Sequence, residues 1–99
     1  MIQVGIDVAG PGEDETVLVA RVGGVVIAQQ AWSLPDPRGE LVAALGNLNR
    51  DRCFRVGPVM VDSVGIGYHV ATHIADHGYE VYGFNAGGAA IDAEHFVNW

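Results

Sequence analysis

Two aspartates, Asp7 and Asp62, each close a short apolar stretch of the sequence. Apolar residues occupy every second position from Ile2 to Val8, which is the period of a strand with one apolar face. The run Val59 to Val61 is typical of a strand that is buried on both faces and pairs in parallel. If these two strands are neighbours, about 4.8 Å apart, their terminal carboxylates can share or flank divalent metal ions. Hard oxygen ligands suit Mg²⁺ or Mn²⁺, and two such ions support phosphodiester hydrolysis.

The first half of the chain predicts the elements that hold Asp7. Residues 16–22 and 25–32 are rich in β-branched and apolar side chains, and Gly23-Gly24 between them indicates a tight hairpin turn. With the strand that contains Asp7 they form a three-stranded antiparallel meander. Asp36, followed by Pro37, predicts the cap of a helix that runs to about residue 49.

The second half predicts the elements around Asp62. The strand that ends at Asp62 is followed by a helix whose apolar stripe includes Val70 and Ile74, and Gly78 ends that helix. Residues 81–84 predict a fifth strand, and residues 92–98 predict at most one or two helical turns. The chain therefore alternates helix and strand after its initial meander.

This order of elements is that of an α/β, ribonuclease H-like fold. The expected sheet is mixed and five-stranded: strands one to three are antiparallel, strands four and five run parallel to strand one, and helices pack on its faces. Strands one and four are then adjacent in the middle of the sheet. Their adjacency is the condition that would bring Asp7 and Asp62 together.

Composition favours one folded domain over residues 1–99. Hydrophobic residues make up 49% of the chain and charged residues 17%, which is far from the composition of a disordered segment. The longest apolar runs are much shorter than the roughly 20 residues of a membrane-spanning helix, and no secretory signal is visible. We therefore expect no membrane partner. Cys53 is the only cysteine, which predicts a buried structural residue in a reducing compartment and hence a cytoplasmic protein.

The charge balance opposes strong binding to nucleic acid. Five arginines and no lysine stand against twelve acidic residues, which gives a net charge of -7 that repels a polyanion. Any contact with DNA must therefore be local. Arg50, Arg52 and Arg55 fall within six residues and are the candidate DNA-binding patch, although a solvated loop after a helix is the simpler explanation of them.

The sequence around both aspartates resembles the C-terminal nuclease domain of phage terminase large subunits, the motors that package and cut viral DNA. Gly5-Ile6-Asp7-Val8-Ala9-Gly10, with Asp14-Glu15-Thr16-Val17 after it, is similar to the first strand, loop and second strand of that family. Val61-Asp62-Ser63-Val64-Gly65-Ile66-Gly67 resembles its central strand and glycine loop. Gly78-Tyr79-Glu80-Val81, Phe84-Asn85 and Phe96-Val97-Asn98 are similar to the segments that follow. The resemblance covers essentially the whole chain.

The resemblance implies a metal-dependent DNA endonuclease that cuts concatemeric viral DNA during genome packaging. Asp7 and Asp62 would be the first two metal-binding, catalytic carboxylates, and the complete site would hold two divalent ions, Mg²⁺ or Mn²⁺. The implied partners are double-stranded DNA, an ATPase motor domain and other packaging proteins. The implied location is the cytoplasm of a bacterial host that carries the phage or prophage.

The third acidic ligand of that family has no match in this sequence. Where the family continues into a further helix and another acidic residue, this chain reads Asn98-Trp99. We therefore expect a ribonuclease H-like domain that lacks its C-terminal helix and third ligand. Asp14, Asp92 and Glu94 are the possible accessory ligands, against a turn-capping role for Asp14 and a solvated helix start for the other two.

Other side chains leave further readings open. His69, His73 and His77 recur every four residues along one helix face, a spacing that can bind Zn²⁺ but also suits a solvated stripe. Tyr68, Tyr79 and Tyr82 could stack on bases or pack in the core and at its rim.

Two other functions share the fold class. A non-catalytic assembly module could keep the fold after losing its chemistry. The strand and loop from Gly5 to Gly12 also resemble the phosphate-cradling segment of sugar kinases and actin-like ATPases, although those proteins need a second lobe. Holliday-junction resolvases are a nearer enzyme alternative, but they generally need a basic surface.

Overall fold

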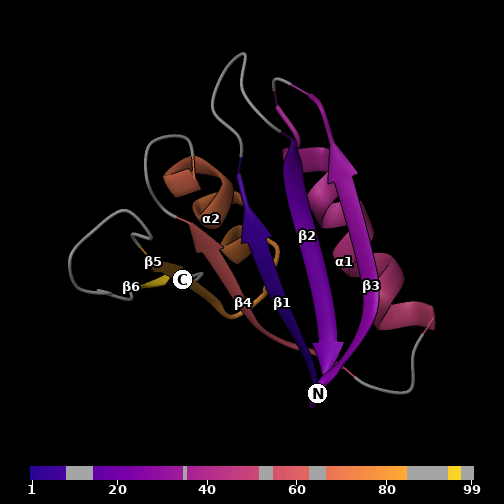
Figure 1. Ribbon diagram of the computed structural model, residues 1–99. Helices are drawn as coiled ribbons and strands as arrows, with labels where there is room; N and C mark the ends of the chain where they lie inside the picture. The colour runs from indigo at the N-terminus through magenta and orange to yellow at the C-terminus, as the bar shows by residue number, and fades with distance from the viewer. Residues whose placement is uncertain (9–14, 35, 52–54, 63–66, 85–93, 97–99) are drawn as a thin grey trace.

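The computed structural model describes residues 1–8, 15–34, 36–51, 55–62, 67–84 and 94–96, and within these ranges it forms one sheet and two helices (Figure 1). In chain order the elements are β1 (Ile2–Asp7), β2 (Thr16–Val22), β3 (Val25–Trp32), α1 (Arg38–Asp51), β4 (Val56–Asp62), α2 (Gly67–Asp76), β5 (Val81–Phe84) and β6 (Glu94–Phe96).

The order of the strands in the sheet is β3-β2-β1-β4-β5-β6. β1 pairs antiparallel with β2 and parallel with β4, β2 pairs antiparallel with β3, and β5 runs parallel to β4. The predicted meander, and the predicted adjacency of strands one and four, are therefore confirmed. The sheet has the strand order of the ribonuclease H-like fold.

A short sixth strand extends the sheet beyond β5. The expectation of helical turns over residues 92–98 is wrong for residues 94–96, which pair antiparallel with β5 between Val81 and Gly83. The physical reason is that β5 would otherwise present unpaired backbone groups at the edge of the sheet. Pairing with that edge satisfies the backbone of both segments, which outweighs a weak local preference for helix.

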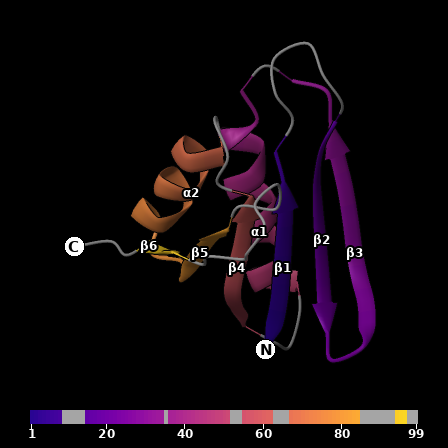
Figure 2. The same ribbon diagram turned by 60° about the vertical axis from the view of Figure 1, so that its left-hand side comes forward.

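Both helices cover the same face of the sheet, as the two views in Figures 1 and 2 show. β1 alternates strictly, with Ile2, Val4 and Ile6 buried under the helices and the intervening residues exposed. The helices contribute the other half of this core: Leu41, Ala44, Leu45 and Leu48 from α1, and Val70, Ala71, Ile74 and Ala75 from α2. Each fully buried Leu or Ile stabilises the fold by about 1.5–3 kcal/mol relative to exposure. This layer of side chains is the main source of stability.

β4 is buried on one face rather than on both. Val59 and Val61 are fully buried beneath the helices, whereas Pro58 and Met60 point to the opposite, outer face and are only half-buried. The expectation of two-sided burial is therefore wrong in the described part of the chain. Neither α1 nor α2 packs on the outer face, so an apolar strand in the middle of the sheet leaves one side accessible.

Neither of these helices is long and apolar enough to cross a membrane.

The start of α1 is capped as the sequence predicts. The Asp36 carboxylate accepts the backbone N–H of Arg38 at 3.2 Å, and the Pro37 carbonyl accepts the first helical bond from Leu41 at 2.9 Å. The Arg38 guanidinium donates to both carboxylate oxygens, through Nε at 2.9 Å and Nη2 at 2.8 Å. These hydrogen bonds from the Arg38 side chain and then from its backbone lower the pKa of Asp36 to about 2.

The end of α2 is set by Gly78, as the sequence predicts. Gly78 has φ of +92°, a conformation that L side chains adopt only with strain. The N–H groups of His77 and Gly78 donate to the carbonyls of Ile74 and Ala75, each at 3.0 Å, and so complete the last turn. By contrast Gly46 lies inside α1, and a Cβ built there has no atom within 4 Å.

These two glycines give a matched pair of substitutions with opposite signs. Gly46→Ala should stabilise the domain by about 0.5–1 kcal/mol, because alanine loses less backbone entropy in a helix and fits the available space. Gly78→Ala should destabilise it by about 1 kcal/mol, because alanine is strained at positive φ. Chemical denaturation of the two variants measures both changes. Equal effects of the two substitutions would contradict the assignment of Gly78 as the helix stop.

The Asp36 cap should make part of the stability depend on pH. The folded pKa of about 2 lies below the ordinary aspartate pKa of 3.8, so the stabilisation is present above pH 4 and is lost as the pH falls towards 2. Asp36→Asn keeps a capping oxygen but has no titrating group, and we expect its melting temperature to fall less over this interval. Thermal scans at pH 5, 4, 3 and 2 provide the comparison. Parallel curves for the two proteins would show that the cap does not couple to pH.

Candidate metal centre

Asp7 and Asp62 are the last residues of two neighbouring parallel strands, β1 and β4. Ile6 is the register partner of Val61, so the next position along both strands places Asp7 beside Asp62. Neighbouring strands lie about 4.8 Å apart, and side chains at matched positions of parallel strands point to the same face. The two predicted carboxylates are therefore brought together at the C-terminal ends of the two central strands.

Strand alternation sends this pair to the outer face of the sheet. Ile6 and Val61 are buried against the helices, whereas Asp7 is exposed and Asp62 is half-buried. Two negative charges at this separation repel one another unless a cation lies between or beside them. Their oxygen atoms are the hard ligands that Mg²⁺, Ca²⁺ and Mn²⁺ prefer. The donor set thus fits a hard divalent cation.

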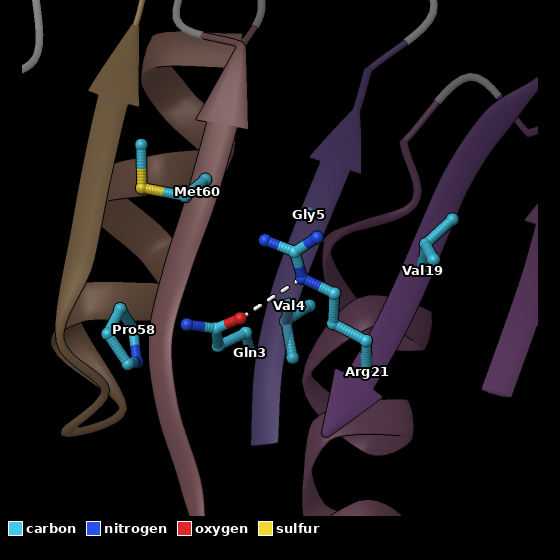
Figure 3. A pocket seen from close by; sticks show the side chains of 7 residues that line it. All are labelled: Gln3, Val4, Gly5, Val19, Arg21, Pro58 and Met60. Atoms are coloured by element: carbon cyan, nitrogen blue, oxygen red, sulfur yellow. Dashed lines mark hydrogen bonds between the residues drawn. The ribbon is translucent and has the colours of Figure 1, made fainter. Parts of the chain in front are cut away.

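A shallow trough runs along β1 on the same face and leads to Asp7. Its first part, of about 360 Å³, is lined by Gln3, Val4, Gly5, Val19, Arg21, Pro58 and Met60 (Figure 3). The adjoining part, of about 280 Å³, is lined by Gly5, Ile6, Asp7, Val17, Val19 and Met60. Gly5, which has no side chain, separates the side chains of β2 from those of β4. The trough is mostly apolar and open to solvent along its length.

Arg21 carries the positive charge of this trough. It extends from β2 across β1, where its Nε donates to the Gln3 side-chain oxygen at 3.0 Å (Figure 3). Arg21 is the register partner of Gln3, whereas Asp7 is the register partner of Val17. The backbone of Arg21 is therefore level with a position four residues before Asp7 on β1. Sequence reasoning missed Arg21. The period-two alternation of residues 16–22 could have placed it on the same face as Asp7.

Two of the three arginines of the predicted patch, Arg50 and Arg55, lie at the other end of the sheet. Arg50 is in the last turn of α1, where its guanidinium donates to the Asn47 side chain, and Arg55 directly precedes β4. The Arg55 carbonyl accepts the N–H of Ile2, at the start of β1, at 2.8 Å. Arg55 and Asp62 are seven positions apart along β4, a span of about 20 Å. Arg52 lies outside the described residues.

Of the three possible accessory ligands, only Glu94 belongs to the described part of the chain. Asp14 and Asp92 lie outside the described residues, and Glu94 begins β6, where its backbone pairs with Gly83. Within the described ranges no cluster of three or more His, Cys, Asp or Glu side chains is arranged to hold a metal ion. The centre built from described residues is therefore a two-carboxylate pair.

The histidine stripe lies on the opposite side of the sheet from this pair, whereas Tyr82 lies on the same outer face. His69 and His73 are on α2 and His77 directly follows it, on the covered side of the sheet. Tyr79 is half-buried against the core, and its hydroxyl accepts the Asn49 side chain at 3.4 Å. Tyr82 is the register partner of Met60, and its hydroxyl donates to Glu80 at 2.5 Å, which raises its pKa.

Comparison with known proteins identifies the fold. No protein-family model matches the sequence, and no curated protein sequence matches it. The structure is similar to the nuclease domain of the large terminase subunit gp2 of bacterial virus Sf6, a mutant form solved with manganese and beta-thujaplicinol. The TM-score is 0.69 and the sequence identity 17% over 92% of this chain. The resemblance to a terminase nuclease domain is thus confirmed at the level of the fold, which is ribonuclease H-like.

The matched protein is considerably larger than this chain. The superposition spans about 40% of the length of that structure. The structural likeness establishes a common fold, but at 17% sequence identity it establishes nothing more. What the chain does must therefore be argued from its own residues.

Proposed function

We propose that this chain is the core of a metal-dependent nuclease domain that hydrolyses phosphodiester bonds in DNA. The observation that carries the proposal is the β1–β4 register, which places Asp7 and Asp62 side by side on an accessible face. The fold shared with a terminase nuclease domain, in a structure that contains manganese, supports the same reading. The biological setting we infer is the cutting of viral DNA during genome packaging, alongside an ATPase motor and other packaging proteins.

Asp7 and Asp62 would hold Mg²⁺ or Mn²⁺ through their carboxylate oxygens. The bound ion would act as a Lewis acid towards a phosphodiester, which is the chemistry that carboxylate pairs support in nucleases. The two aspartates orient the cation because each is anchored at the end of a hydrogen-bonded strand whose preceding residue is buried. The outer face leaves room for a polynucleotide to approach them.

The charges of the chain predict how DNA would be held. The net charge of -7 opposes long-range attraction, so the backbone must be held by local contacts. Arg50, Arg52 and Arg55 are the proposed contacts. Of these, Arg55 lies about 20 Å from Asp62 along β4, which is close to the length of six base pairs. A duplex lying along the sheet could reach both.

Metal binding is the first test of the proposal. Binding to the native state alone stabilises it by RT ln(1 + [L]/Kd), about 2.7 kcal/mol at a hundredfold excess over Kd, so Mn²⁺ should raise the melting temperature. Asp7→Asn and Asp62→Asn should each abolish this shift, because each removes one of two ligands. Glu40→Gln, which removes an exposed carboxylate in the first turn of α1, is the matched control and should keep it.

A plasmid-nicking assay with the same four proteins completes this test. We expect slow, Mn²⁺-dependent nicking that both Asn variants reduce to background, because two-metal catalysis needs both ions held in place and the described site supplies two carboxylates. A metal-dependent shift without any cleavage would identify the non-catalytic module of the same fold. A shift that survives both substitutions would reject Asp7 and Asp62 as the metal centre.

Weak, salt-sensitive DNA binding is the second expectation. Three phosphate contacts give a slope of log K against log salt near -2.7, so affinity should fall about fortyfold between 50 and 200 mM salt. Replacing Arg50, Arg52 and Arg55 with Ala should remove most of this slope. Arg38→Ala is the control, because Arg38 is held in an ion pair with Asp36 at 2.8 Å. Sub-micromolar binding at physiological salt, or an unchanged slope in the triple variant, would contradict the patch.

A further inference from the structure

The end of α2 places two imidazoles against one another. His73 and His77 are four residues apart, one helical turn, and their ring centroids are 4.6 Å apart with planes tilted by 59°. His73 is half-buried and His77 is exposed. Histidines at this spacing on one helix face are the arrangement that chelates a metal ion from a single element.

A hydrogen bond determines which nitrogen of His77 can bind a metal. Nδ1 of His77 lies 2.9 Å from the backbone carbonyl oxygen of His73. A carbonyl oxygen can only accept, so Nδ1 carries the hydrogen and donates, and in the neutral ring the lone pair is on Nε2. Metal-binding histidines are commonly oriented in this way, with one ring nitrogen bonded to a backbone carbonyl and the other on the metal.

The electrostatic setting also favours a cation. His77 directly follows the C-terminal end of α2, where the helix dipole is negative, and the chain carries a net charge of -7. Imidazole nitrogen is a ligand for Zn²⁺, Cu²⁺ and Ni²⁺, whereas Mg²⁺ and Mn²⁺ prefer carboxylate oxygen. The two histidines should therefore select a different class of ion from Asp7 and Asp62.

We propose that His73 and His77 form a two-point chelate for a divalent transition metal ion of the Zn²⁺ class, separate from the carboxylate pair. Nε2 would be the ligand atom of His77, and water would fill the positions that the two histidines leave open. The site lies on α2, which covers one face of the sheet, whereas the carboxylates are on the other. It does not depend on the proposed nuclease function.

His69 provides a natural control within the same helix. It lies four residues before His73, so it has the same spacing to His73 as His77 has. It lies eight positions before His77, about 12 Å at the rise of a helix, so one ion cannot bind both. The proposed pair therefore predicts different results for two chemically identical substitutions.

Isothermal titration of the untagged chain with Zn²⁺ alone, in a Cys53→Ser background that removes the thiol, tests the site. His73→Ala and His77→Ala should each weaken Zn²⁺ binding by at least about tenfold, because an ion held by one imidazole loses the advantage of two ligands on one rigid element. His69→Ala should leave binding unchanged, as should Asp7→Asn with Asp62→Asn.

His77→Gln separates metal binding from helix capping. Its side-chain amide can still donate to the His73 carbonyl but supplies no imidazole. We expect it to keep the helical circular dichroism of the parent and to lose Zn²⁺ affinity as His77→Ala does. Absence of Zn²⁺ binding in the parent, full affinity in His77→Gln, or loss of affinity in His69→Ala or the aspartate variants would each overturn the proposal.

Discussion

The parallel pairing of β1 with β4 is the constraint on which the rest of the structure depends. It joins the N-terminal meander to the helix–strand–helix–strand segment, so it converts two local units into one sheet. A parallel pair needs a long crossover, and here the chain returns through β2, β3 and α1 before β4 is added. The register of this pair sets which residues of the two strands share an edge and a face. The position of Asp7 beside Asp62 is a direct consequence.

The two faces of the sheet have different physical tasks. The face under α1 and α2 holds the buried aliphatic side chains, and its burial stabilises the fold. Asn49 ties that layer to the sheet, since its side-chain oxygen accepts the N–H of Val56 at 2.9 Å while its amide donates to Tyr79. The outer face carries the carboxylates and the trough, where Val19 and Met60 stay partly accessible. Stability on one face therefore leaves the other available for binding.

Charge is distributed so that binding must be local. A chain with twelve acidic and five basic residues attracts cations everywhere and repels a polyanion. Within that field, the two proposed metal sites differ in ligand chemistry: carboxylate oxygens at the strand ends suit hard cations, and imidazole nitrogens at the end of α2 suit softer ones. Arg50 and Arg55 lie at the far end of the sheet from the carboxylates, so the proposed phosphate contacts and the proposed metal site are separated along the strands.

The sequence alone determined the local elements and the faces they bury, because these depend on short-range patterns. Alternation predicted that Asp7 points away from the core, the Asp36-Pro37 pair predicted the start of α1, and Gly78 predicted the end of α2. The adjacency of strands one and four was also predicted, through the order of elements, which is that of a ribonuclease H-like fold. Tertiary structure decided what depends on contacts between distant residues. Glu94–Phe96 became a strand because the edge of β5 offered it partners, and Met60 stayed half-buried because both helices took the opposite face. The trough forms only when β2, β1 and β4 lie side by side, since its lining residues come from all three strands.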